Sequence, residues 1–283
     1  MREFIDTKLG QMHVRVEGAG HPLLLLGSAG RSSRMFDELM RLLSGRYQVF
    51  APDLFGSGNS DPLAADVSLT AMAECMVDLF DAHHIERMHV YGYHTGNKIG
   101  AALAANWPAR VDKLILAGQS HSLIASNEER NRVIGVRTRE YFDAEDSPDQ
   151  MARAMSAWAT LQRRVGALWW PDELFSESGG RAQALAQARI LVMDELQAFD
   201  STRALYEANF AYDFMADLCR IQASTLILEV TTPDEDAQIG RQGERMAEHL
   251  AKASVQTLQA TGFRLTLEDR APELARILSA FFT

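Results

Sequence analysis

A histidine stands at the centre of a short segment whose residue types and spacing could support chemistry. The segment, residues 88–104, reads MHVYGYHTGNKIGAALA. Its apolar start predicts a strand and its small residues predict a helix, with Gly92 and Gly96 at an abrupt turn between them. His94 lies at the apex of that turn. Because an imidazole is largely neutral at pH 7, His94 could accept a proton, donate a hydrogen bond or attack an acyl carbon.

Strand patterns and helical patterns alternate along most of the chain. A hairpin is expected over residues 2–17, and the unbroken apolar run Leu23–Leu26 predicts a buried strand. Further strands are expected at 47–51, 88–91, 111–117, 224–230 and 255–258, and helices near 33–43, 69–83, 95–106, 242–251 and 272–282.

Between about Ser120 and Ala211 the pattern becomes mainly helical. Strand–helix alternation that is interrupted once by a helical insert predicts an α/β protein, with a mostly parallel central sheet flanked by helices and a helical cap. We expect the core to comprise residues 1–119 and 216–283, and the cap residues 120–215.

Composition narrows the class of protein and of partner. The 283 residues are 47% hydrophobic and 23% charged, which is typical of a globular protein with a full core. The net charge of −10 argues against nucleic acid or an anionic membrane as a partner. The N-terminal residues lack the apolar centre of a signal peptide, and no run approaches the roughly 18 apolar residues of a membrane span.

The two cysteines, Cys75 and Cys219, lie far apart in helical patterns, and we expect both to be reduced thiols in the core. Reduced thiols fit a cytoplasmic protein. The expected partner is a small-molecule substrate, and the sequence leaves open whether the chain also forms a homodimer.

Several segments occur in an order that matches a known family. These are the strand and loop Leu23–Gly30, the turn-rich loop Asp53–Asp61, the turn Gly92–Gly96, the strand Ser224–Val230 and the loop Thr261–Asp269. Together they resemble the α/β-hydrolase superfamily along nearly the whole chain, in particular its members with a cap. The resemblance implies a nucleophile elbow at Gly92–Gly96, an oxyanion hole formed by backbone N–H groups, and no cofactor.

Two departures from the family pattern concern the catalytic residues themselves. The elbow apex is His94, where the family usually has Ser, Asp or Cys. The loop that usually carries the catalytic histidine has Phe263 in that position, and no histidine follows His249. The loop after the first parallel strand also reads Gly27-Ser28 where the family usually has His-Gly. The Ser-His-Asp mechanism of the family therefore cannot operate in its usual form.

The oxyanion hole that the resemblance implies does not depend on the replaced side chains. Its donors would be the backbone N–H of Thr95 and that of Ser28 or Ala29. The positive end of the helix that starts near Thr95 disfavours an imidazolium at His94. A neutral base beside such donors suits hydrolysis of an activated carbonyl, enolisation or C–C bond cleavage.

Other residues could support His94. By resemblance, the acid position falls near Asp234, with Asp236 as the second choice, although either could be an ordinary loop carboxylate. Ser120 and His121 follow the strand that ends at Ala117, and His121 could be a displaced base or could line the cap junction.

Further residues are expected to line the pocket: Ser28, Tyr93, Trp169 and Phe263. For Trp169, packing of the cap on the core is the more common explanation, and Ser28 could instead bond its own backbone. The spacing of histidines and cysteines gives no zinc motif, and no glycine-rich phosphate loop follows a strand. We therefore expect neither a metal nor a cofactor.

The sequence favours a cofactor-free enzyme that acts on a small carbonyl compound through His94, by ester or lactone hydrolysis or by C–C cleavage. In this reading His94 is the general base or, alternatively, the nucleophile. Two other readings remain. The chain could be an inactive relative that binds small molecules, with His94 a satisfied polar residue, or a cofactor-free lyase or oxygenase on the same scaffold.

Overall fold

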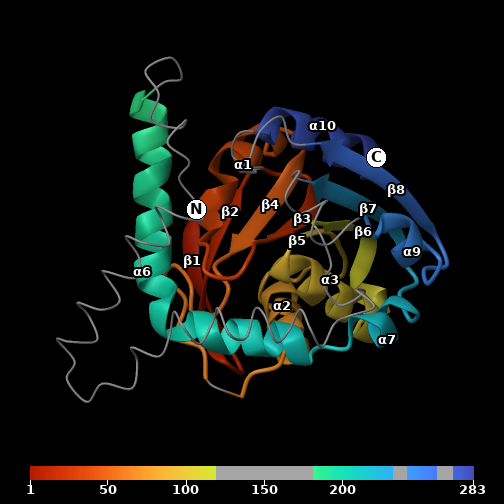
Figure 1. Cartoon of the computed structure of the whole chain (residues 1–283), viewed down its shortest axis with the longest axis horizontal. Coiled ribbons are helices and arrows are strands. Elements are labelled where there is room, and N and C mark those ends of the chain that lie inside the picture. Colours follow the sequence, from red (N-terminus) through yellow and green to blue (C-terminus); the bar gives the residue numbers. More distant parts are fainter. Residues whose placement is uncertain (65, 119–180, 232–240, 260–269) are drawn as a thin grey trace.

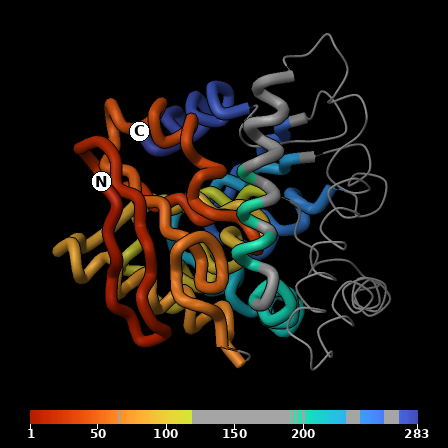
Figure 2. Tube along the Cα trace, turned by 90° about the vertical axis from the view of Figure 1, so that its left-hand side faces the viewer, coloured from red at the N-terminus to blue at the C-terminus, as the bar shows by residue number. Residues whose placement is uncertain are grey.

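An eight-stranded sheet organises the part of the chain that the computed structural model describes, residues 1–64, 66–118, 181–231, 241–259 and 270–283. The strand order is β1-β2-β4-β3-β5-β6-β7-β8. β1 (Arg2–Thr7) and β2 (Gly10–Glu17) form the predicted antiparallel hairpin at one edge of the sheet (Figure 2). β2 also pairs antiparallel with β4, and every later pairing is parallel. The mostly parallel sheet is confirmed.

The parallel strands lie where the apolar runs predict them. They are β3 (His21–Leu26), β4 (Tyr47–Pro52), β5 (Met88–Tyr93), β6 (Val111–Ala117), β7 (Ser224–Thr231) and β8 (Ala253–Gln259). Leu26 at the end of β3 pairs with Gly92 of β5. Because the carboxyl ends of parallel strands meet at one edge, this register brings the loop after β3 beside the turn after β5.

Helices cover both faces of the sheet (Figure 1). One face carries α1 (Asp37–Leu43), which follows a 3-10 turn at Ser33–Phe36, and α10 (Ala271–Phe281). The other face carries α2 (Leu69–Ala82), α3 (Thr95–Asn106), α7 (Phe214–Leu218) and α9 (Gly243–Ala247), with a second 3-10 turn at Pro108–Arg110. The helix expected near 242–251 is shorter than predicted.

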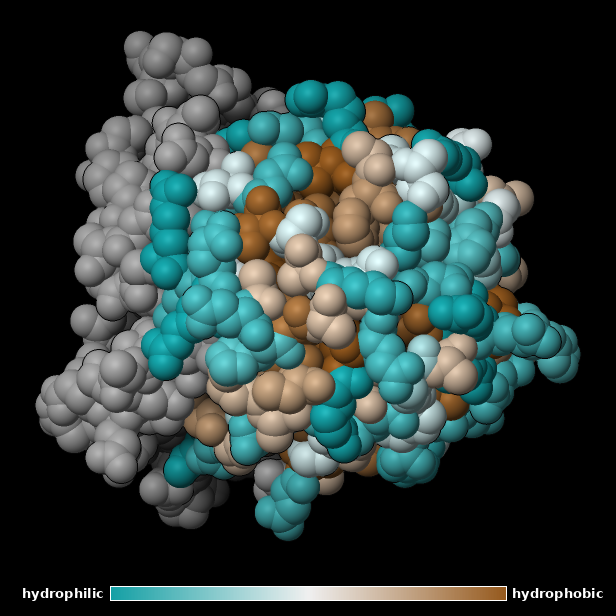
Figure 3. Space-filling model, turned by 90° about the vertical axis from the view of Figure 1, so that its right-hand side faces the viewer, coloured by the Kyte–Doolittle hydropathy of each residue, from teal (hydrophilic) through white to brown (hydrophobic). Residues whose placement is uncertain are grey.

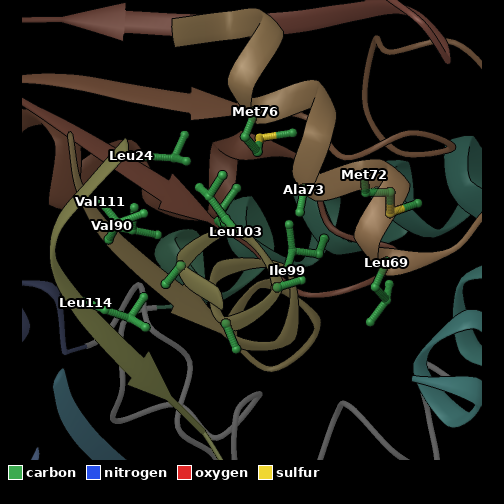
Figure 4. Packing of buried hydrophobic residues seen from close by; sticks show 14 of the residues in the cluster. Leu24, Leu69, Met72, Ala73, Met76, Val90, Ile99, Leu103, Val111 and Leu114 are labelled. Atoms are coloured by element: carbon green, nitrogen blue, oxygen red, sulfur yellow. The ribbon is translucent and has the colours of Figure 1, made fainter. Parts of the chain in front are cut away.

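The packing of α3 fixes the depth of the turn at its start. Ile99 and Leu103 of α3 lie between the sheet and α2 (Figure 4). At Gly100 an added Cβ would lie only 3.4 Å from both Leu114 Cδ1 and Val90 Cγ1. A helix this close to the sheet tolerates only a small residue at that position, as the small-residue pattern of the segment predicts.

The long helix α6 (Arg181–Ala211) contacts the loops after β3 and β4. Asp194, buried in α6, accepts hydrogen bonds from Arg31 Nε at 3.1 Å and from Ser32 Oγ at 2.5 Å. Ser201 Oγ accepts one from the Leu63 N–H at 3.2 Å. Residues 120–180 of the expected cap lie outside the described residues, so the cap boundaries 120–215 remain a prediction.

The prediction of two buried thiols is correct only for one cysteine. Both cysteines are free, but Cys219 is exposed while Cys75 is buried in α2. Cys219 caps the C-terminus of the short helix α7, beyond the helix residues that pack against the core. The cytoplasmic location inferred partly from buried thiols remains a prediction.

The described surface bears on two expectations about partners, that there is no membrane partner and that a homodimer is open. Within the described ranges, no helix has the length and apolar character that crossing a membrane requires. The side of the molecule that carries β8, the other edge strand, mixes hydrophobic and hydrophilic residues (Figure 3). A homodimer remains open.

Candidate active site

The turn between β5 and α3 has a strained apex. β5 ends at Tyr93 and α3 begins at Thr95, so His94 alone makes the corner, with φ 48° and ψ −108°. A positive φ is costly for a residue with a Cβ, by about 1–3 kcal/mol, and persists only where the surroundings enforce it. Here the His94 N–H donates to the Ala117 carbonyl at 3.0 Å, and the His94 carbonyl accepts from the Asn97 N–H at 3.1 Å. His94 is therefore held at the apex by backbone contacts.

The two glycines of the turn are required by close backbone approach. A Cβ at Gly92 would lie 2.2 Å from the carbonyl oxygen of Gly96, and a Cβ at Gly96 would lie 2.2 Å from that of Leu26. The Gly96 N–H donates to the Gly27 carbonyl at 2.9 Å. The turn and the loop after β3 are thus joined directly, without room for a side chain between them.

The His94 ring is enclosed by neighbouring residues, although it keeps some exposed surface. Its centroid lies 4.1 Å from that of the Tyr93 ring, and a Cβ on Gly118 would lie 3.1 Å from His94 Nδ1. Burial, and after it the nearby ammonium of Lys98, lowers the pKa of His94 to about 4. With this lowered pKa the imidazole is neutral at pH 7, and burial is the largest cause.

Lys98 is a buried cation one helical turn beyond the apex. It is 5% exposed, and its Nζ donates to the Asn209 carbonyl of α6 at 3.3 Å. Lys98 was not among the residues expected at the site. A lysine within an otherwise small and apolar helix was the available signal, because such a helix packs against the core on most of its surface.

The hydroxyl of Thr95 links the predicted oxyanion loop to α6. Thr95 Oγ1 accepts from the Ala29 N–H at 3.2 Å and from Asn209 Nδ2 at 3.1 Å. Ser28 and Ala29 therefore lie beside Thr95 and His94, as the resemblance implies. A ligand oxygen that used the Ala29 N–H would compete with the Thr95 hydroxyl. Asn209 was not anticipated, because it lies 114 positions from Thr95.

A buried pair formed by a residue of β2 and the residue that follows β4 was also not anticipated. His13 Nδ1 lies 2.8 Å from Asp53 Oδ2. The same carboxylate accepts from the N–H groups of Ser33 at 2.6 Å and Asn59 at 2.9 Å. Asp53 therefore holds the loop after β4 and the start of the 3-10 turn at Ser33 in place. These hydrogen bonds give the Asp53–Asp61 loop a structural role that needs no catalytic explanation.

Six of the predicted site residues lie outside the described residues: Ser120, His121, Trp169, Asp234, Asp236 and Phe263. Their roles remain predictions. β6 and β7 are the next strands in the sheet after β5, and both run parallel to it, so their carboxyl ends lie at the same edge as His94. The buried carboxylate that the structure does describe on β7, Glu229, accepts from the Gly243 N–H at 2.7 Å and from Thr257 Oγ1 at 3.0 Å, so it binds α9 and β8.

A comparison with protein families decides the identity of the fold. A family model described as the alpha/beta hydrolase fold matches residues 21–166, just over half of the 283 residues. The chain belongs to the α/β-hydrolase fold family. The strained turn at His94 lies at the strand–helix corner where members of this family carry the nucleophile elbow. The role of His94 at this corner remains a prediction.

Relatives of this α/β hydrolase match it over part of their length. A Mycobacterium bovis protein without an assigned activity is 37% identical over 102 residues, which are 36% of this chain and 30% of that protein. A pimeloyl-[acyl-carrier protein] methyl ester esterase of Aeromonas hydrophila is 34% identical over 121 residues, 41% of this chain and 46% of the esterase. The matched segment thus spans less than half of each of these relatives.

Solved structures match the whole chain. A hydrolase from Pseudomonas aeruginosa has a TM-score of 0.74 and 22% identity, over 100% of this chain and 98% of that one. The enol-lactonase from Burkholderia xenovorans LB400 has a TM-score of 0.75 and 18% identity, over 99% of both chains. At these identities the likeness concerns the fold alone.

Proposed function

We propose that this α/β hydrolase is a cofactor-free enzyme that acts on a small organic carbonyl compound, with His94 as its general base. The observation that carries the proposal is a neutral imidazole at the apex of the elbow, beside the loop that supplies oxyanion donors in this family. The family, and a relative named as an esterase, support the broader class of hydrolase.

In the proposed reaction His94 takes a proton from the water that attacks an ester or lactone carbonyl, or from an acidic carbon next to a carbonyl. A positioned general base contributes about 10²–10⁴-fold to the rate. The Thr95 N–H and the N–H of Ser28 or Ala29 would hold the oxygen that becomes negative, each donor contributing about 10²–10³-fold. Direct attack by His94 on an acyl carbon is the less favoured variant.

The low pKa of His94 restricts the substrate. An imidazole with a pKa of about 4 is a weak base, because its protonated form would be buried beside the Lys98 ammonium. Proton abstraction is then efficient only where the proton is already acidic or the acyl group is activated. Aryl esters, strained lactones and 1,3-diketones meet that condition, whereas ordinary alkyl esters and amides do not.

The remaining predicted residues complete the proposal. Asp234, or else Asp236, would supply a carboxylate at the edge where β7 ends, and His121 would be the displaced base if His94 is not the base. Ser120, Trp169 and Phe263, together with the described Tyr93, would shape the substrate pocket. Substituting each of these residues and measuring turnover tests the role proposed for that residue.

A specific contact favours a second candidate, a small-molecule binder without chemistry. The Ala29 N–H already donates to Thr95 Oγ1, so one of the two oxyanion donors has a partner within the protein. In an inactive relative such a contact has no catalytic cost. The two candidates differ in whether bound carbonyl compounds turn over.

The test measures turnover of activated aryl esters, lactones and 1,3-diketones by the unchanged protein and by His94→Ala. We expect His94→Ala to lower kcat/KM at least 100-fold. The matched control is His84→Asn, because His84 is the other described residue with a side chain and a positive φ, at 56°, and lies exposed at the end of α2. This control should retain full activity.

Two results would overturn the assignment of His94. One is full activity of His94→Ala on a substrate that the unchanged protein turns over. The other is covalent labelling by a fluorophosphonate, which would reveal a reactive serine such as Ser28. Binding of these compounds without turnover in either protein would establish the binder instead.

A further inference from the structure

Three metal-ligating side chains meet at the edge of the sheet opposite the elbow. His21 is the first residue of β3, His89 the second of β5 and Asp112 the second of β6. These strands are neighbours in the sheet, and Leu23 of β3 lies opposite His89 in the register. Residues at the amino ends of three adjacent parallel strands therefore converge, as residues at the carboxyl ends do around His94.

The donor atoms of this cluster lie close together. One ring nitrogen of each histidine and one carboxylate oxygen of Asp112 all lie within 4.8 Å of one another. His21 Nε2 is 2.9 Å from Asp112 Oδ2, while Arg87 Nε is 2.8 Å from Asp112 Oδ1. Arg87 thus fixes the carboxylate through one oxygen and leaves the other facing His21.

His89 gives an independent reason to expect a ligand. Its side chain is 7% exposed, and in the described part of the chain no hydrogen bond satisfies its buried Nδ1 atom, although the Phe282 backbone interacts with the ring. Its ring stacks on Phe282, with centroids 4.7 Å apart and an interplanar angle of 5°, and lies 4.1 Å from the His21 ring. Buried polar atoms nearly always have a partner, so an unsatisfied ring nitrogen within a set of ligand types calls for one.

We propose that His21, His89 and Asp112 bind a divalent transition-metal ion, with Zn²⁺ as the best match. Imidazole nitrogen and carboxylate oxygen bind Zn²⁺ at about 2.0–2.2 Å, which puts tetrahedral donors about 3.4 Å apart. The side chain of His21 is 45% exposed, so its ring can turn to bring the three donors to that spacing. Two imidazoles favour Zn²⁺ over Mg²⁺ or Ca²⁺, which prefer oxygen ligands.

The bound ion would act as a clamp on the fold. It would join the amino ends of β3, β5 and β6 and, through the stack of His89 on Phe282, the residue that follows α10. Arg87 is a positioning residue, because it contacts the ligand Asp112 rather than the ion. The site lies apart from the elbow, so it does not depend on the proposed reaction at His94.

The test titrates chelator-treated protein with Zn²⁺ alone by calorimetry, and with Co²⁺ alone to record the absorption of its coordination shell. We expect one equivalent to bind and the thermal unfolding midpoint to rise. His21→Ala should weaken Zn²⁺ binding at least tenfold and remove most of the thermal shift. Arg87→Gln should weaken it about tenfold, since residues that orient metal ligands typically contribute 10–100-fold.

Two ligand variants are used because one of them could fail to fold. His21 is largely exposed, and Asp112→Asn preserves shape, so at least one of the two should fold as the unchanged protein does. The control is His84→Asn, which removes an exposed histidine next to His83 at the end of α2. The proposal is overturned if Zn²⁺ binds equally well to His21→Ala and Asp112→Asn, if His84→Asn alone loses binding, or if no stoichiometric binding occurs.

Discussion

The two ends of β5 place a histidine in two different settings. His89 lies in the regular strand near its amino end, and His94 lies just past its carboxyl end with a φ of 48°. The pKa of each ring is lowered to about 4, mainly by burial. The backbone is what differs, because the strand imposes no strain on His89 while the elbow holds His94 in a conformation that few residues adopt.

This difference shows two ways in which a fold fixes a functional side chain. At the carboxyl edge the constraint is local, since two glycines and a few backbone hydrogen bonds force one residue outward. At the amino edge the constraint is the register of three strands, which brings together residues from positions 21, 89 and 112. Changes to the elbow should therefore affect stability and chemistry more strongly than changes at the amino edge.

The largest effect is expected at Gly92. A Cβ there would lie 2.2 Å from a backbone oxygen, so Gly92→Ala should lower the free energy of unfolding by about 3 kcal/mol or more. Gly100→Ala is the matched control, because its Cβ would meet side chains at 3.4 Å and a helical Gly→Ala change gains up to about 1 kcal/mol. Denaturant unfolding measures both. Equal stabilities of the two variants would show that the close backbone approach at Gly92 does not exclude a Cβ.

The next effect concerns pH and His94. Its pKa lies near 4 in the folded protein and near 6.5 when unfolded, so the unfolded state takes up a proton first and stability falls as pH drops from about 6.5 to about 4. Among the described residues, the Tyr93 ring and the Lys98 ammonium face the His94 ring.

In His94→Gln this contribution should disappear, about 2 kcal/mol across that range after allowance for the partial exposure of the ring. His89 contributes equally to both proteins, so the difference between their curves isolates His94. Identical pH dependence of unfolding in the two proteins would contradict the lowered pKa.

A smaller effect should expose the strain at the apex. Glycine adopts a positive φ without steric cost, whereas alanine does not. We therefore expect His94→Gly to be more stable than His94→Ala by about 1 kcal/mol, in unfolding experiments at pH 7. If His94→Ala were the more stable variant, the apex would carry no strain.

The smallest effect belongs to the amino edge. His21 pairs with Asp112 in a setting that is 45% exposed at the histidine, so His21→Ala should change the stability of the metal-free protein by less than about 1 kcal/mol. Thermal unfolding after chelator treatment checks this. A loss as large as that of Gly92→Ala would mean that the contact between His21 and Asp112, rather than a bound metal, stabilises that edge.

Most of the fold was predictable because its signals are local. Apolar runs predicted the strands β3, β5 and β6, and small residues predicted the helix α3. The spacing of Gly92 and Gly96 then predicted that His94 lies at the apex of the turn between β5 and α3. The prediction that both cysteines are buried was wrong for Cys219, which is exposed and caps the end of α7. A helix pattern in the sequence does not show where a short helix ends.

The contacts around the apex were predictable only in part. Ser28, Ala29 and Thr95 come together because adjacent parallel strands end at one edge, which the order of motifs implies. Lys98 and Asn209 meet only through the packing of α6 on α3, and His21, His89 and Asp112 only through strand register. The spacing of residues in the sequence reveals neither the packing of α6 on α3 nor the register of the strands. For that reason a metal site was not expected.

The central claim is that His94 is a neutral imidazole that performs the chemistry. The pH dependence of kcat/KM on an activated ester tests it most directly, because this profile reports the ionisation of the free enzyme. We expect activity to fall only as the pH drops below the His94 pKa of about 4, and we expect this fall to be absent from any residual activity of His94→Ala. A limb near pH 6.5, or a profile unchanged in His94→Ala, would contradict it.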